Sequence, residues 1–323
     1  MAEAKAFWVM APGRGEVRSE LLPAPGAGEV LVETLASGIS RGTETLVFQG
    51  LVPKSQHQVM RAPFQAGEFD FPLKYGYSSV GTVTDGTPEL QGRRVFCLYP
   101  HQDRYVVPAS AVVPVPEDVP DARAVLAANL ETALNGLWDA APRIGDRVAV
   151  IGAGVVGALA AALLAGMPGT DVQLSDVNPD KAAVAAALEV DFALPDAARG
   201  DVDLVIHASG AAEGLARALE LAGFEARIVE LSWYGDRAVA LPLGEAFHSR
   251  RLRLISSQVG AVAAAQRPRW DRRRRLALAL DLLADPRFDA LLAPAVPFVR
   301  LPEVMAELAT RPSDVMCQVI SYR

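Results

Sequence analysis

The sequence has little cysteine and little lysine, and the shortage of cysteine excludes two kinds of site. The two cysteines, Cys97 and Cys317, are too few for a disulfide framework or for a four-thiolate zinc site. Lysine occurs at only four positions, so arginine supplies almost all of the positive charge, and the formal net charge is -7. A chain with this acidic balance does not predict nucleic-acid binding, which needs clustered positive charge.

No stretch of the sequence is typical of export or of membrane insertion. Residues 1–15 lack the basic start, apolar core and small-residue cleavage site of a secretory signal. The run 148–167 has the length of a membrane span, but it contains Gly152, Gly154 and Gly157 and is typical of a buried strand, turn and helix. We therefore expect a cytoplasmic protein with no membrane partner.

The basic segment 267–275 is the one candidate for binding an anionic partner. It contains Asp271 and a single aromatic residue, Trp270, which differs from the basic and aromatic alternation of nucleic-acid-binding surfaces. The sequence favours an exposed helical face or a contact with an acidic partner.

The pattern of short elements changes near residue 120. Residues 1–119 alternate short apolar runs with glycine and proline, which predicts a compact β barrel or sandwich. Beyond residue 120, strand-like and helix-like segments alternate, which predicts an α/β fold with a doubly wound parallel sheet. We expect domains at 1–119 and 120–258, with residues 259–323 returning to the first.

A glycine-rich turn carries the strongest functional signal. The strand-like residues 147–151 lead into Gly152-Ala-Gly154-Val155-Val156-Gly157 and then into an alanine-rich helix. The first glycine permits a tight turn, the second lets backbone approach a diphosphate, and the third lets the helix pack on the strand. The amides at the helix start favour an anion, so the pattern predicts a dinucleotide site.

A carboxylate indicates which dinucleotide is bound. Asp176 ends the next strand-like segment, where it can accept hydrogen bonds from ribose hydroxyls and repel a 2′-phosphate, which favours NAD over NADP. Two alternatives remain. The glycines can serve close packing with no ligand, and methyltransferases that use S-adenosylmethionine share the glycine turn and the acid but do not need the β-rich N-terminal domain.

With these segments the chain resembles the medium-chain dehydrogenase/reductase superfamily. Residues 36–45, ASGISRGTET, are similar to the first active-site loop of the family, and residues 74–83, KYGYSSVGTV, to its Gly-His-Glu-x-x-G stretch. The resemblance implies a Rossmann domain, a GroES-like β-barrel domain and a homo-oligomer. It also implies that Asp176, Asn178 and Lys181 hold the adenosine ribose.

The resemblance fails at the zinc ligands. Ser40, Tyr77 and Ser78 stand where zinc-dependent relatives carry cysteine, histidine and glutamate, and only Glu131 matches a ligand position. Hydroxyl groups are poor zinc ligands compared with thiolate and imidazole. We therefore expect a zinc-free member with no metal site.

Without zinc, side chains must polarise a carbonyl or take the proton of an alcohol. The Tyr77 phenol is one candidate, Thr43 and Glu44 lie in the loop that holds the hydroxyl relay of relatives, and His101 is a further acid or base. The alternatives are a core tyrosine with its hydroxyl satisfied locally and a surface histidine.

Residues after later strands complete the predicted cofactor site. Ser209, Gly210 and Trp233 follow strand-like segments whose carboxyl ends bind ligands in doubly wound sheets, and His207 is expected to pack in the core or against the cofactor. The predicted function is hydride transfer between NAD(H) and an alcohol or carbonyl substrate. A non-catalytic NAD(H)-sensing protein is the alternative from another class.

Overall fold

The computed structural model describes residues 2–310 and 315–323 of the chain. The chain divides into two compact units. Unit 1 comprises Met1–Ala128, Leu276–Asp285 and Leu292–Arg323, and unit 2 comprises Asn129–Arg275 and Pro286–Leu291.

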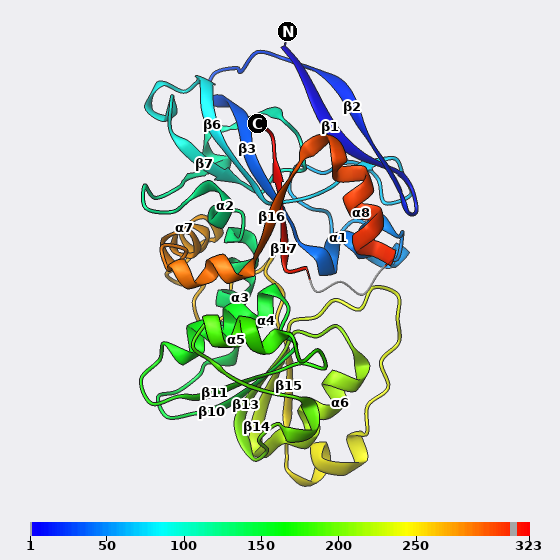
Figure 1. The fold of residues 1–323 in the computed structure, drawn as a ribbon, viewed down its shortest axis with the longest axis vertical. Coiled ribbons are helices and arrows are strands. Elements are labelled where there is room, and N and C mark those ends of the chain that lie inside the picture. Colours follow the sequence, from blue (N-terminus) through cyan, green and yellow to red (C-terminus); the bar gives the residue numbers. More distant parts are fainter. Residues whose placement is uncertain (1, 311–314) are drawn as a thin grey trace. The chain divides into compact units, whose positions relative to one another are not determined.

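Unit 1 is built on β sheets. One sheet has the strand order β2-β1-β5-β4, and the other has the order β16-β17-β3-β6-β7-β9, with β8 also paired to β3. Figure 1 shows β17 of the C-terminus beside β3, where Gln318 pairs with Ile39 in antiparallel register. The strands are β1 (Ala2–Ala11), β2 (Arg14–Leu22), β3 (Glu29–Ile39), β4 (Ala66–Gly67), β5 (Leu73–Lys74), β6 (Ser79–Gly86), β7 (Arg94–Cys97), β8 (Arg104–Pro108), β9 (Val112–Pro114), β16 (Leu292–Pro297) and β17 (Cys317–Ser321).

Alternation of side chains explains the core of unit 1. Strand β3 alternates half-buried and buried residues from Glu29 onward, which is the period of a strand with one buried face. Its Val30 and Val32 pack with Val83, Val95 and other buried residues. The predicted β-rich fold of the N-terminal residues is therefore confirmed.

Unit 2 contains a six-stranded sheet of order β12-β11-β10-β13-β14-β15, and all its strand pairs are parallel. Its strands are β10 (Arg147–Ile151), β11 (Asp171–Ser175), β12 (Asp191–Ala193), β13 (Val202–His207), β14 (Ala222–Glu230) and β15 (Arg253–Ser256). The strand order runs one way from β10 to β12 and the other way from β13 to β15. Right-handed crossovers then place the connecting helices on opposite faces, as predicted for a doubly wound sheet.

Helices complete both units. The α-helices are α1 (Arg41–Phe48), α2 (Asp121–Ala124), α3 (Ala127–Ala140), α4 (Val155–Ala165), α5 (Lys181–Ala187), α6 (Ala212–Leu221), α7 (Arg272–Leu282) and α8 (Leu301–Thr310). Single turns of other helix types are η1 (Lys54–Gln56), η2 (Pro88–Leu90), η3 (Ala109–Ala111), η4 (Pro195–Ala197), η5 (Leu243–Phe247), η6 (Pro286–Leu291) and η7 (Phe298–Arg300).

The apolar run 148–167 folds as a buried strand, a turn and a helix, as the sequence predicts. Strand β10 is buried except at Arg147, and α4 is buried on most of its circumference because both lie in the centre of unit 2. Among the described residues, no helix has the length and apolarity that a bilayer crossing requires.

Candidate functional site

The glycine-rich turn lies between β10 and α4 and leaves backbone exposed. Gly152 has a φ of +102°, which strains any residue with a side chain, and a Cβ there would lie 2.6 Å from the amide nitrogen of Ser209. A Cβ on Gly157 would collide with the carbonyl oxygen of Gly152, whereas one on Gly154 would meet open space. Gly154 also offers no side chain to cap α4, so the helix start can receive an anion.

Asp176 follows β11 and ties the next strand to this turn. Its Oδ2 accepts a hydrogen bond from the amide of Ala153 at 2.7 Å, and its Oδ1 accepts one from the amide of Asn178 at 2.9 Å. The Oδ1 atom of Asn178 in turn accepts from the Asp180 amide at 2.9 Å. Lys181 begins α5 and is buried. The predicted adenosine-binding trio therefore follows β11 directly, next to the glycine turn.

The adjacent strands β13 and β14 end in a chain of polar side chains. His207 is fully buried, its Nδ1 lies 2.7 Å from Oε2 of Glu230, and its Nε2 lies 2.6 Å from Oγ of Ser209. Oε1 of Glu230 accepts from the Ser232 amide at 2.6 Å, and Oε2 accepts from the Tyr234 hydroxyl at 3.0 Å. Burial opposes ionisation of Glu230, but the hydrogen bonds and charge of His207 and the bonds from Ser232 outweigh it, so the pKa of Glu230 is lowered.

The other predicted residues of this region flank that chain. Gly210 adopts a φ of +68°, and its amide donates to Oγ of Ser232 at 3.0 Å. Trp233 is half-buried in the segment after β14. Ser209, Gly210 and Trp233 thus follow the carboxyl ends of β13 and β14. The sequence reasoning missed Glu230, although a carboxylate that ends a strand beside a histidine ending its neighbour is a readable signal.

Unit 1 holds a second polar cluster. Nε2 of His101 lies 2.9 Å from Oε2 of Glu44, and Nδ1 of His101 lies 2.7 Å from Oγ of Ser37, which lies 3.0 Å from the hydroxyl of Tyr322. His101 has 1% of its surface exposed and Glu44 3%. The surface position considered for His101 is therefore wrong, because its ring is buried between Ser37 of strand β3 and Glu44 of helix α1. Ser37 and Tyr322 were not anticipated.

Tyr77 reaches the same cluster from the segment before β6. Its hydroxyl forms hydrogen bonds with the side chains of Ser40 and Thr43. Glu44 accepts a hydrogen bond from the amide of Ser40 at 2.7 Å. Burial, followed by the negative charge of Glu44, raises the pKa of Tyr77, so the phenol keeps its proton at neutral pH. The structure thus brings Thr43, Glu44, Tyr77 and His101 together around Ser40.

The residues that the resemblance places at zinc-ligand positions do not form a metal cluster in the described part of the chain. No group of three or more His, Cys, Asp or Glu side chains suited to a metal ion occurs among residues 2–310 and 315–323. Cys317 is buried beside the Ile39 carbonyl, and burial raises the pKa of its thiol to about 12. The buried hydroxyl of Ser78 has no hydrogen-bond partner within the described residues.

Glu131 is engaged by Arg275. Nε of Arg275 donates to Oε1 of Glu131 at 2.9 Å, and both side chains are almost fully buried. The same guanidinium also donates to Asn135 and to the carbonyl of Val259. Burial raises the pKa of Glu131 and Arg275 opposes that rise. The basic segment 267–275 is therefore not uniformly an exposed face, because its last arginine is a core residue.

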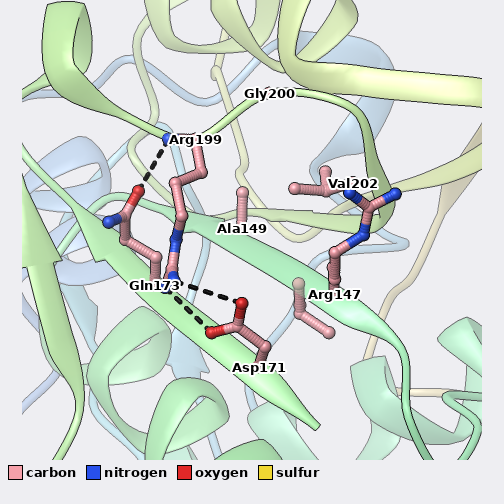
Figure 2. Close-up of a pocket in the computed structure, with 8 residues that line it drawn as sticks. Arg147, Ala149, Asp171, Gln173, Arg199, Gly200 and Val202 are labelled. Atoms are coloured by element: carbon pink, nitrogen blue, oxygen red, sulfur yellow. Dashed lines mark hydrogen bonds and ion pairs between the residues drawn. The ribbon is translucent and has the colours of Figure 1, made fainter.

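A cavity of about 270 Å³ lies at the opposite end of the unit 2 strands from the glycine turn. Figure 2 shows Arg199 over Asp171 and Gln173, with the Asp171 carboxylate 3.0 Å from Nη2 of Arg199. The cavity is lined by Arg147, Val148, Ala149, Asp171, Gln173, Arg199, Gly200 and Val202. Ligands of doubly wound sheets bind at the carboxyl ends of the strands, so this cavity does not belong to the candidate site.

Known proteins resemble this chain in part of its sequence and throughout its fold. No protein-family model matches the sequence. L-threonine 3-dehydrogenase from Ruegeria pomeroyi is 31% identical over 127 residues, which are 39% of this chain and 36% of that protein. The chain thus matches about a third of the length of this curated relative.

Two solved structures match nearly the whole chain. A structure from Sinorhizobium meliloti, described as a zinc-binding dehydrogenase bound to NADP, is 19% identical with a TM-score of 0.80 and covers 99% of this chain and 100% of its own. Acetophenone reductase from Geotrichum candidum in complex with NAD is 17% identical with a TM-score of 0.77, covering 99% of this chain and 97% of its own. At these identities the likeness establishes the fold.

Proposed function

We propose that this chain, which has the Rossmann and GroES-like fold of the medium-chain dehydrogenase/reductase superfamily, transfers a hydride between NAD(H) and an alcohol or carbonyl substrate. The observation that carries the proposal is the open space at Gly154, beside the start of α4, which no side chain caps, and beside the Asp176 carboxylate. Both solved structures named above contain a nicotinamide dinucleotide, which supports the same ligand here.

The glycine turn and the start of α4 fit a dinucleotide. The amides of Val155 and Val156 at the start of α4 would hold the diphosphate, since helix N-termini favour anions. Asn178 and Lys181 would assist at the ribose. The bound dinucleotide supplies the hydride, and the residues after β13 and β14, namely Ser209, Gly210 and Trp233, would line its site.

Asp176 supports NAD as the preferred dinucleotide. Its carboxylate has used one oxygen for each of the two amides that it holds, and each oxygen can accept a further hydrogen bond from a ribose hydroxyl. A 2′-phosphate would instead meet this negative charge. Because one solved neighbour is bound to NADP, the choice between the two dinucleotides must be measured on this chain.

Tyr77 is the proposed proton donor and acceptor for the substrate oxygen. The hydroxyls of Ser40 and Thr43 orient its phenol, and the raised pKa keeps that phenol protonated and ready to donate. Behind it, Glu44 and His101 form a buried pair that fixes the Ser40 amide. Thr43, Glu44 and His101 are thereby proposed to serve proton transfer during carbonyl reduction and alcohol oxidation.

We also propose that the reaction proceeds without catalytic zinc. Glu131, the one residue that matches a ligand position of zinc-dependent relatives, is held by the Arg275 guanidinium. Ser40 and Tyr77 replace stronger ligands and hydrogen-bond to each other. Zinc analysis of protein purified without chelator or histidine tag tests this point, and one bound ion per chain would contradict it.

The test of function is a comparison of binding and turnover. Fluorescence titration should give tighter binding of NADH than of NADPH, and the reverse order would contradict the role of Asp176. A panel of primary and secondary alcohols with NAD, and of ketones and aldehydes with NADH, should then reveal turnover. Binding of NADH with no turnover on any substrate would indicate a sensing protein instead of an enzyme.

We further propose a cytoplasmic homo-oligomer, with residues 1–119 and 259–323 as the GroES-like domain and residues 120–258 as the Rossmann domain. These bounds differ from those of the two compact units at residues 120–128, 259–275 and 286–291. Both cysteines are free and buried, which agrees with a reducing compartment. Light scattering in solution measures the oligomeric state.

A further inference from the structure

The donors and acceptors in the hydrogen-bonded series Ser209, His207 and Glu230, at the ends of β13 and β14, can be assigned. The lowered pKa of Glu230 keeps its carboxylate ionised, and a carboxylate can only accept hydrogen bonds. Nδ1 of His207, at 2.7 Å, must therefore carry a hydrogen and donate it. In the neutral ring Nε2 is then the acceptor, so the Ser209 hydroxyl donates to it across 2.6 Å.

Helix α6 leaves space for the contact between Ser209 and His207. Gly214 lies inside α6, where glycine is less favourable than alanine by about 1 kcal/mol. A Cβ at this position would lie 2.8 Å from Nε2 of His207 and would overlap Oγ of Ser209. The glycine therefore keeps open the space in which the serine meets the imidazole.

Ser209 also lies at the point where the strand order reverses. Strands β10 and β13 are neighbours whose connections leave in opposite directions, and ligands of doubly wound sheets bind in the crevice at this point. The backbone of Ser209 is the nearest neighbour of the Gly152 Cβ position, at 2.6 Å. Ser209 itself is exposed. The backbone of Ser209 thus borders the turn proposed above to hold a diphosphate, and its exposed side chain follows the carboxyl end of β13.

Protonation of His207 reverses the polarity of Ser209. A proton on Nε2 makes the imidazole a donor to Oγ, and the hydroxyl hydrogen of Ser209 is released to point outward. The amide of Ala211 donates to the same oxygen at 3.2 Å. Ser209 therefore offers lone pairs while His207 is neutral and a hydrogen once His207 is charged. The oxygens of a dinucleotide diphosphate are acceptors and carry negative charge.

We infer that His207 and Glu230 are positioning residues that act through Ser209, so that binding of the dinucleotide is coupled to uptake of a proton by His207. The inference rests on the proposed function, because it takes the ligand of the glycine turn to be a nicotinamide dinucleotide. By linkage, a ligand that binds together with a proton binds more weakly as the pH rises.

Two other titratable groups lie beside His207. Glu230 and Tyr234 face it from the segment that ends β14. Burial and the Glu230 charge raise the pKa of Tyr234, so it stays protonated, while Glu230 stays ionised. Arg237 supplies the neighbouring cation, since it lies over the Tyr234 ring and donates to the Gly210 carbonyl. Strand β10 and α6 present Ile151 and Gly214, which do not titrate.

A serine, a histidine and a carboxylate in this order also form the catalytic group of acyl-transfer enzymes, but the donors around Ser209 do not favour that role. A nucleophile needs amide hydrogens aimed at the developing oxyanion. The Gly210 amide, which follows the serine, donates to Ser232, and the Ala211 amide donates to Ser209 itself. The dinucleotide contact is therefore the assignment that these bonds support.

The first experiment measures the dissociation constant of NADH between about pH 5 and 8, the range in which histidine titrates. The expected result is a constant that rises with pH by up to about tenfold per unit, the limit for one coupled proton. Calorimetry in two buffers of different ionisation enthalpy should show proton uptake on binding. Measurable binding with no pH dependence and no uptake would overturn the inference, whereas absence of NADH binding at every pH would instead contradict the proposed function.

Variants test which side chains cause the pH dependence of NADH binding. Ser209→Ala removes the hydroxyl that bonds to His207 and should weaken NADH binding most at low pH, which flattens the profile. Glu230→Gln removes the charge that favours protonated His207 and should move the pH-dependent limb to lower pH. Ser249→Ala, a matched change at an exposed serine that bonds only to Glu245, should leave the profile unchanged. A Ser209→Ala profile identical to that of the parent would sink the role of Ser209.

Nitrogen NMR of the imidazole gives a readout that needs no turnover. In the ligand-free protein at high pH, His207 should show the hydrogen on Nδ1, and addition of NADH at fixed pH should shift its signals toward the doubly protonated form. Signals that show the hydrogen on Nε2, or that do not respond to NADH, would contradict the coupling. Ser209-dependent release of nitrophenol from p-nitrophenyl acetate would assign the group to acyl transfer and also overturn it.

Discussion

Nε2 of His101 lies 2.9 Å from Oε2 of Glu44, and the two side chains are buried together beside Ser40 and the first turn of α1, which carries Thr43. The pair has no exposed edge from which to meet a substrate. It therefore acts through its neighbours, and the nearest chemically active neighbour is Tyr77, whose hydroxyl bonds to both Ser40 and Thr43.

The first prediction concerns Tyr77 itself. Tyr77→Phe should lower turnover by about 10²-fold or more, the usual range for loss of one acid or base, and should leave the dissociation constant of NADH unchanged. Steady-state kinetics and fluorescence titration measure the two quantities. Tyr75→Phe is the matched control, since Tyr75 packs edge-on against Tyr77 and is itself buried. Equal turnover in parent and Tyr77→Phe would remove Tyr77 from the mechanism.

A second prediction concerns the effect of Glu44 on that phenol. The charge of Glu44 is a cause of the raised pKa of Tyr77, so Glu44→Gln should lower this pKa toward the ordinary value for tyrosine. The change can be read from the ultraviolet absorbance of tyrosinate during alkaline titration, after subtraction of the same titration for variants that also carry Tyr77→Phe. An unshifted or upward-shifted titration would show that the carboxylate does not act on the phenol.

Local patterns predicted the parts of the structure that depend on local sequence. The strand, turn and helix around Gly152 and the parallel sheet of unit 2 follow from period and glycine placement. The partners of buried polar groups did not follow, because they are distant in the chain. His101 and Glu44 are 57 residues apart, and Ser37 meets Tyr322 across 285 residues.

The basic segment illustrates the same limit. Six arginines in nine residues favoured an exposed face, yet Arg275 lies in the core because Glu131, 144 residues earlier, faces it there. The composition of a segment predicts its average exposure. It does not predict that Arg275 is buried while the other arginines of the same helix are exposed.

The third prediction follows from that ion pair. Arg275→Met should cost about 3–5 kcal/mol in the free energy of unfolding at neutral pH, because it leaves the Glu131 charge buried and unpaired. Burial already raises the pKa of Glu131, and loss of the guanidinium should raise it further. A group with a raised folded pKa contributes stability at low pH and loses it as the pH rises through that value. Urea unfolding should therefore show the deficit shrinking as the pH falls.

The double variant Arg275→Met with Glu131→Leu is the control for this argument. It replaces the pair by apolar side chains and should recover much of the lost stability, since no charge is then left buried. A deficit in Arg275→Met that is the same at all pH values, with no recovery in the double variant, would mean that packing and not charge sets the cost.

The fourth prediction concerns Asp176. Asp176→Asn keeps an oxygen for one of the two amides that the carboxylate now holds but removes the charge. NADPH should then bind more tightly than it does to the parent, while NADH binding weakens, so the ratio of the two dissociation constants shifts toward NADPH. Asp180→Asn, at an exposed position on the same segment, is the matched control and should leave the ratio unchanged. A ratio unaffected in Asp176→Asn would contradict the electrostatic basis of the proposed NAD preference.

The fifth prediction compares two helical glycines. Alanine is the better helix former by about 1 kcal/mol, so Gly→Ala in a helix stabilises wherever space allows. At Gly42, in α1, a Cβ would meet nothing within 4 Å, and Gly42→Ala should be neutral or stabilising in thermal unfolding.

At Gly214, the new methyl group would lie 2.8 Å from Nε2 of His207 and overlap Oγ of Ser209, so one of them must move. Gly214→Ala should therefore lower the melting temperature and weaken NADH binding together, because the hydrogen bond between the serine and the imidazole is disturbed. Stabilisation by Gly214→Ala equal to that by Gly42→Ala would contradict the close packing of Gly214 against Ser209 and His207.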